Sequence, residues 1–332
     1  VRHMLENGAT STTTSRPRMN MPTAEPTLAA LPNPVLRYVL ACRPPFLSVT
    51  LFACLIGLGS AQASGVAIAW APALATIVFA LLAHAGVNVL NDYYDALNGT
   101  DAINIDRVFP YTGGSRFIQN GVLSAAATAR FGAALFALVV AAGLWLALWS
   151  GPGLLAIGLT GLVIGWAYSA PPLRLNSRGL GELAVAAGFA LIVIGSDYVQ
   201  RHAFALAPLI AAVSYALLVT NILYLNQFPD RAADAAVGKR HWVVRLRPRQ
   251  ARWGYVAIGV AAYGWLIGAV LAGLLPARAL LALLAALPSA QAARELLRYA
   301  TQPRALAPAI RKTIAAAALH GLLLAGALFG GG

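Results

Sequence analysis

Charged residues are scarce in this sequence, and cysteine is nearly absent. Asp, Glu, Lys and Arg together make up 11% of the 332 residues, whereas soluble domains carry roughly 25%. Cys42 and Cys54 lie twelve positions apart, which is about 18 Å along a helix and too far for a disulfide bond. No Cys-x-x-Cys motif occurs and the five histidines are scattered, so neither a zinc nor a haem site is predicted.

Long apolar runs fill most of the sequence instead. Hydrophobic residues make up 59% of the chain, and a run of about 20 apolar residues can cross a bilayer as a helix. We therefore predict an all-α membrane protein with about nine transmembrane helices in a bundle around a central cavity. The expected spans lie near residues 45–63, 69–97, 124–148, 152–169, 180–200, 204–229, 251–274, 278–298 and 311–329. They form one domain, residues 35–332.

The first 34 residues differ from the rest in composition. Residues 1–34 are rich in Thr, Pro, Ala and Asn and show no apolar period, so we expect them to be disordered. The opening Val-Arg-His-Met resembles a cloning remnant, and the segment has no long apolar core of the kind that a secretory signal needs.

Basic residues give the chain a net charge of +13. With nine spans, all but two of the 24 Lys and Arg residues fall on one side of the membrane, the exceptions being Arg201 and Arg278. Positive loops mark the cytoplasmic side, so we predict a cytoplasmic N-terminus in a multi-pass protein of the inner (cytoplasmic) membrane. The charges lie in short loops beside lipid headgroups, which argues against a nucleic-acid partner and for membrane lipids.

Six of the 11 acidic residues lie in two short windows at predicted cytoplasmic helix ends. Asn88, Asn91, Asp92 and Asp95 follow one another at spacings of three and four, which places them on one helix face. Asp101 and Asp106 come soon after them. Acidic groups near membrane depth are costly, so they usually mark function.

The second window repeats this pattern. Asn226, Asp230 and Asp234 are each four residues apart, and Asn226 precedes Asp230 as Asn91 precedes Asp95. A single carboxylate at a helix end is most often a solvated interfacial residue, but two matched clusters favour a site for Mg²⁺, which binds a few carboxylates and substrate phosphates. We expect an active site that faces the cytoplasm.

Basic and polar residues near the acids are candidates for binding a diphosphate. These are Arg116, Tyr168, Arg174 and Lys239. A phosphate needs cationic partners besides its metal, although each Arg could instead be a positive-inside anchor. Gly113-Gly114 is either a flexible turn or an anion-binding nest. His84, one turn before Asn88, is either a packed interior histidine or an acceptor-binding residue.

The pair of motifs, NDYYDALNGTD and NQFPDRAADAAVGKR, resembles those of the UbiA superfamily of intramembrane aromatic prenyltransferases. The stretches YSAPPLRLNSRGLGELAVAAGFA and TGGSRFIQNGVLS, together with Arg43-Pro44, are most similar to the menaquinone branch, which prenylates 1,4-dihydroxy-2-naphthoate. The resemblance covers residues 37–330. It departs from the family at Gly99, where many members have an acid that Asp101 could replace, and at Asp197.

The resemblance implies a site and a reaction. Asn91, Asp92, Asp95, Asp101, Asp230 and Asp234 would hold Mg²⁺, with Asn88 and Asn226 as further polar site residues. Lys239, Arg116, Tyr168 and Arg174 would bind the diphosphate, and Asp95, Asp230, Asp234 and Lys239 would be catalytic. The isoprenyl diphosphate would ionise, and the ring of an aromatic acceptor would attack the carbocation and lose carbon dioxide.

Two other acceptors or reactions stay open at this point. The acceptor could be another aromatic compound such as 4-hydroxybenzoate, or the same scaffold could cyclise a prenyl diphosphate without any acceptor. A transporter is disfavoured, because the acids lie at helix ends and no Gly- or Pro-broken pair of helices lies at the midplane.

Overall fold

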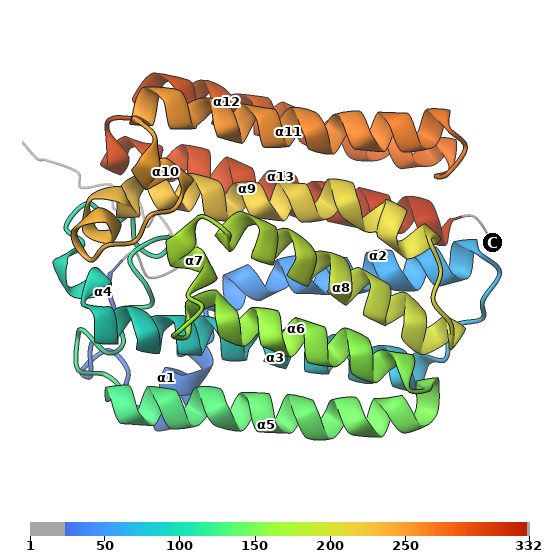
Figure 1. Cartoon of the computed structure of the whole chain (residues 1–332), viewed down its shortest axis with the longest axis horizontal. Helices are drawn as coiled ribbons and strands as arrows, with labels where there is room; N and C mark the ends of the chain where they lie inside the picture. Colours follow the sequence, from blue (N-terminus) through green and yellow to red (C-terminus); the bar gives the residue numbers. More distant parts are fainter. Residues whose placement is uncertain (1–23, 331–332) are drawn as a thin grey trace, which may run out of the picture.

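The computed structural model describes residues 24–330, which form helices and loops without a β-strand. The long helices lie alongside one another in a bundle (Figure 1). The elements are α1 (Pro34–Ala41), α2 (Pro44–Ala63), α3 (Trp70–Asn98), α4 (Thr100–Ile103), α5 (Ala125–Ser150), α6 (Gly153–Ser169), α7 (Leu175–Arg178), α8 (Gly181–Arg201), α9 (Ala207–Ala236), α10 (Trp242–Arg245), α11 (Pro248–Leu271), η1 (Ala277–Ala285), α12 (Ala286–Tyr299), η2 (Pro303–Leu306) and α13 (Ala307–Phe329).

Eight helical segments of the described chain are long and apolar enough to cross a membrane. They are α2, α3, α5, α8, α9, α11, the continuous pair η1 and α12, and α13 with the short η2 before it. The expected span at residues 152–169 is α6, which is apolar but has 17 residues. The all-α membrane fold is thus confirmed, whereas the count of nine spans and the cytoplasmic N-terminus stay predictions.

Helix α9 extends beyond its predicted end. The expected span ended near residue 229, but the helix continues to Ala236 with Pro229 buried inside it. The continuation keeps Asp230 and Asp234 on one helix, as their spacing predicted.

The predicted disordered segment lies mainly outside the described residues, at positions 1–23. Residues 24–33 are described, and Asn33 caps α1 by accepting a hydrogen bond from the backbone N–H of Val35 at 2.9 Å. Both cysteines are free thiols, as predicted.

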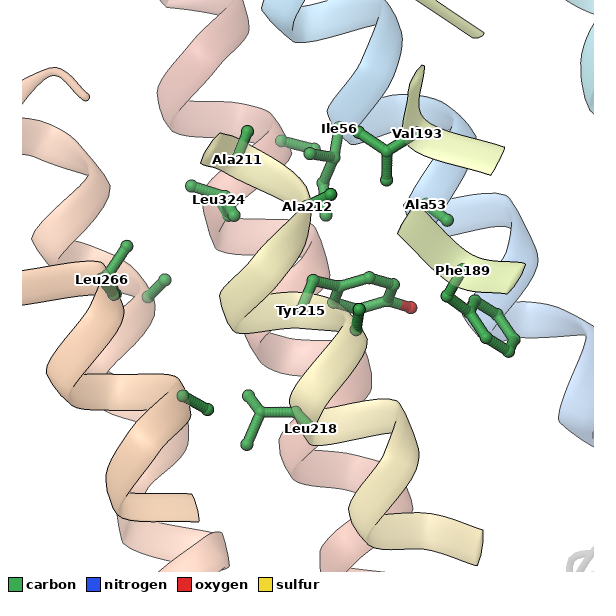
Figure 2. Packing of buried hydrophobic residues seen from close by; sticks show 14 of the residues in the cluster. Ala53, Ile56, Phe189, Val193, Ala211, Ala212, Tyr215, Leu218, Leu266 and Leu324 are labelled. Atoms are coloured by element: carbon green, nitrogen blue, oxygen red, sulfur yellow. The ribbon is translucent and has the colours of Figure 1, made fainter. Parts of the chain in front are cut away.

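The core is packed around α9, with α2, α8, α11 and α13 against it (Figure 2). Small residues let these helices approach closely: a Cβ added at Gly57 of α2 would lie 2.2 Å from the carbonyl oxygen of Val193 on α8. The hydroxyl of Tyr215 on α9 donates to the carbonyl of Val49 on α2 at 2.6 Å. This packing holds α9, and with it the second acidic window, in a fixed place.

Candidate active site

A cavity of about 710 Å³ is lined by α2, α3, α5, α6, α8 and α9. Most of its wall is apolar, with Phe79, Phe136, Leu162 and Leu191 among the side chains that line it. Its polar end carries nine of the predicted site residues: Asn88, Asn91, Asp95, Asp101, Tyr168, Asn226, Asp230, Asp234 and Lys239. The cavity thus joins a polar end to a long apolar chamber.

The two acidic windows meet through one lysine. The ammonium nitrogen of Lys239 lies 2.8 Å from a carboxylate oxygen of Asp95 on α3 and 2.9 Å from one of Asp234 on α9. Burial disfavours the charged lysine, but the two carboxylates outweigh that effect and raise its pKa. The other oxygen of Asp234 lies 3.0 Å from Nε2 of His241, which also lines the cavity.

Asparagine side chains hold two of the acids, although Asn226 itself donates to the carbonyl of Tyr111 at 3.4 Å and not to Asp230. The side-chain amide of Asn91 donates to Asp95 at 3.2 Å and to the hydroxyl of Ser169 at 2.9 Å. Asp230 accepts a hydrogen bond of 2.6 Å from the amide of Asn104, a residue of the loop after α4. The sequence pattern did not single out Asn104 or His241, because neither belongs to a repeated spacing.

Asp92 differs from its neighbours in the first window. It is buried, but it does not line the cavity; both of its carboxylate oxygens accept from the backbone N–H of Ser115, at 3.2 and 3.3 Å. Asp92 lies at the edge of the helix face that its spacing predicted, and it holds the loop beside the cavity.

Of the two neighbouring glycines of this loop, Gly114 approaches the acids closely and Gly113 faces the side chain of Arg107. Gly113 and Gly114 both have a positive φ, 75° and 71°. A Cβ added at Gly114 would lie 2.3 Å from Oδ2 of Asp101. Glycine is needed here for the close approach as well as for the backbone conformation.

We expect Gly114→Ala to lower the catalytic rate about tenfold, because the added methyl group pushes Asp101 away from the cavity end. Gly121→Ala is the matched control: Gly121 has φ 67° in the same loop, but nothing lies within 4 Å of its added Cβ. Steady-state kinetics on the two variants separates the steric effect from backbone strain. Equal losses in both would contradict the role of the close approach.

Two predicted diphosphate contacts lie away from the cavity wall. Arg116 is buried, donates to the backbone carbonyl of Asp101, and lies 3.6 Å from the carboxylate of Glu25. Arg174 is exposed at the start of α7. Neither lines the cavity, whereas Tyr168 and Lys239 do. Arg116 therefore supports the short helix α4 that carries Asp101, and direct diphosphate binding by either arginine stays a prediction.

Glu25 is a residue that the sequence analysis missed. Its carboxylate pairs with Arg107 at 2.5 Å and accepts from the amide of Asn120 at 3.2 Å. Arg107 in turn donates to the carbonyl of Asn104 at 2.6 Å. The low-complexity composition around Glu25 hid this role, because only the tertiary fold brings residue 25 beside the loop after α4.

Carboxyl groups outnumber lysine and arginine side chains at the polar end of the cavity. Burial, followed by the charges of Asp95, Asp92 and Asp230, raises the pKa of Asp101 to about 8. A cation bound among these groups would offset their repulsion.

The residues at the polar end of the cavity fit a divalent cation whose remaining ligands are water or phosphate oxygens. The carboxylates of Asp95 on α3 and Asp234 on α9 both contact the ammonium group of Lys239, so side chains of the two helices can share one cation. Among residues 24–330, no three carboxylate, imidazole or thiol side chains form a complete cage for an ion. Carboxylates that converge from two helices suit Mg²⁺, which takes one or two carboxylates and fills its octahedron with water and phosphate oxygens.

Residues 50–325 match the family model of the UbiA prenyltransferase family. The chain belongs to the UbiA prenyltransferase family. It is 33% identical to the 1,4-dihydroxy-2-naphthoate octaprenyltransferase of Mycobacterium tuberculosis, over 88% of this chain and 96% of that protein. It is 30% identical to the enzyme of the same name from Escherichia coli, over 80% and 88%.

Solved structures of UbiA homologues have the same fold. A UbiA homologue from Archaeoglobus fulgidus bound to GPP and Mg²⁺ matches with a TM-score of 0.58 and 15% identity, covering 87% of this chain and 99% of that one. Membership of a family of prenyl-transferring enzymes confirms the predicted resemblance and enzyme class.

Proposed function

We propose that this UbiA protein transfers a polyprenyl group from an isoprenyl diphosphate to 1,4-dihydroxy-2-naphthoate, a step of menaquinone biosynthesis, with Mg²⁺ as cofactor. The observation that carries the proposal is the convergence of the two acidic windows at one end of an apolar cavity. The acceptor is supported by the relatives named for it, which match most of the chain.

Each part of the cavity has a task in this reaction. Asp95, Asp230 and Asp234, with Asn91, would hold Mg²⁺, which neutralises charge on the departing diphosphate. Lys239 would donate to the same diphosphate, and the hydroxyl of Tyr168 lies at the same end of the cavity. The apolar wall would take the prenyl chain and exclude water from the allylic cation.

Arg43 is the side chain best placed for the carboxylate of the acceptor. It lines the cavity, its Nη2 donates to the carbonyl of Tyr111 at 3.1 Å, and its guanidinium lies 4.9 Å from the ring centre of Phe46. Its buried Nε has no hydrogen-bond partner among the described residues. A bound carboxylate would satisfy that donor.

A product assay tests the proposal. Purified protein in detergent receives Mg²⁺, a polyprenyl diphosphate, and either 1,4-dihydroxy-2-naphthoate or 4-hydroxybenzoate, and the products are identified by mass spectrometry. Prenylation of the naphthoate alone is the expected result. Diphosphate release with a cyclic terpene as the product, and no prenylated acceptor, would instead support the cyclase.

A further inference from the structure

His84 is a polar side chain in the apolar part of the cavity wall. Thr76 and Ser196 also line this part, but their hydroxyls donate to backbone carbonyls of their own helices. His84 lines the cavity from α3, among apolar neighbours such as Ala80, Ala83 and Val87. Helix geometry places it about 6 Å before Asn88 and about 16 Å before Asp95 along the axis. His84 thus lies deeper than the acidic residues, on the same wall.

A hydroxyl and an aromatic ring fix the orientation of His84. Its Nδ1 lies 2.8 Å from Oγ1 of Thr50, a fully buried residue of α2. The ring of Phe189 packs edge-on against the imidazole, with centroids 5.7 Å apart and an interplanar angle of 90°. Nδ1 is therefore occupied, and the other ring nitrogen, Nε2, has no hydrogen-bond partner in the described part of the chain.

A prenyl chain would leave this nitrogen unsatisfied, because hydrocarbon neither donates nor accepts a hydrogen bond. An unpaired polar group in a dry site is costly. A ring hydroxyl both donates and accepts, and so does a neutral imidazole whose tautomer can follow the rotation of the Thr50 hydroxyl. A hydroxyaryl ligand therefore matches His84 better than the prenyl chain does.

We propose that Nε2 of His84 hydrogen-bonds a ring hydroxyl of the aromatic acceptor, and that Thr50 is the positioning residue that holds the imidazole for this contact. The inference rests on the proposed function. Together with a carboxylate contact at Arg43, it fixes the acceptor at two points. Two fixed points decide which ring carbon faces the allylic carbon of the prenyl donor.

The test compares acceptors that differ by one hydroxyl. The acceptors are 1,4-dihydroxy-2-naphthoate, 1-hydroxy-2-naphthoate and 4-hydroxy-2-naphthoate, and kcat/KM is measured for the unmodified chain and for His84→Phe. In the unmodified chain, the acceptor that lacks the hydroxyl contacting His84 loses one hydrogen bond. Its kcat/KM, relative to that of the dihydroxy acceptor, is therefore about tenfold lower than the reactivity of the ring alone would give. In His84→Phe this tenfold difference in relative kcat/KM disappears, because the hydrogen bond is absent with every acceptor. The ratio between proteins cancels the intrinsic reactivity of each ring.

The matched control is His320→Phe. His320 is also a buried histidine bonded to a hydroxyl, with Nε2 3.0 Å from Oγ of Ser214, but it does not line the cavity. This variant keeps the full acceptor preference. Thr50→Val raises the KM for the acceptor and leaves the KM for the diphosphate unchanged, and Thr50→Ser restores the acceptor KM.

Folding and donor binding are checked with a prenyl thiolodiphosphate, which stabilises each variant against heat as it does the unmodified chain. A His84→Phe protein that transfers prenyl groups with undiminished preference for the dihydroxy acceptor would overturn this inference alone. Absence of transfer to any naphthoate by the unmodified chain, with thiolodiphosphate binding intact, would overturn the proposed acceptor and this inference with it.

Discussion

Asp95→Asn and Asp230→Asn are each expected to lower prenyl transfer about 10³-fold, the scale of losing one main electrostatic contact to a developing charge. The two residues come from different helices, yet both line the same end of the cavity. An amide keeps the shape of the carboxylate but removes its charge, so the affinity for a divalent cation falls while the bundle stays folded.

Mn²⁺ titration followed by electron paramagnetic resonance measures the loss of cation binding directly, beside the kinetic assay. Asp197→Asn is the control, because Asp197 is a fully buried aspartate of α8 that pairs with Arg201 at 2.8 Å and does not line the cavity. Activity and Mn²⁺ affinity are expected to survive in Asp197→Asn. Unchanged Mn²⁺ binding in both cavity variants would refute the metal site.

The helical bundle and the acidic windows could be predicted from sequence because both depend on local patterns. Apolar runs bounded by polar loops give helix positions to within a few residues, as for α2 and α8. The four-residue spacing of Asn226, Asp230 and Asp234 places them on one helix face, although Pro229 lies between the first two. Such patterns can be recognised without knowing how the helices pack, because they depend only on which face of a single helix is buried.

The parts that sequence could not predict depend on how distant segments pack. Arg116 belongs to a motif beside the site, but its side chain turns to the carbonyl of Asp101 and to Glu25. His84 is one histidine within an apolar helix, and only the contact with Thr50 of α2 shows that its free nitrogen belongs to the cavity. Neither orientation has a periodic signal in the sequence.

Lys239→Met is expected to destabilise the protein in the absence of Mg²⁺ and to slow prenyl transfer about 100-fold. Lys239 is the cation that joins Asp95 and Asp234, all three being largely buried. Removing one partner of a buried ion pair leaves an uncompensated charge and costs about 3–5 kcal/mol. The melting temperature in chelator should therefore fall, on the order of 5 °C for a chain of this size.

Because Mg²⁺ would replace the lost positive charge, it should raise the melting temperature of Lys239→Met more than that of the unmodified chain. Lys312→Met is the matched control, since Lys312 pairs with Glu295 on the α12–α13 side and does not line the cavity. Its melting temperature should respond to Mg²⁺ as the unmodified chain does. If Mg²⁺ raised the melting temperatures of both lysine variants equally, the idea that Mg²⁺ replaces the charge of Lys239 between α3 and α9 would be refuted.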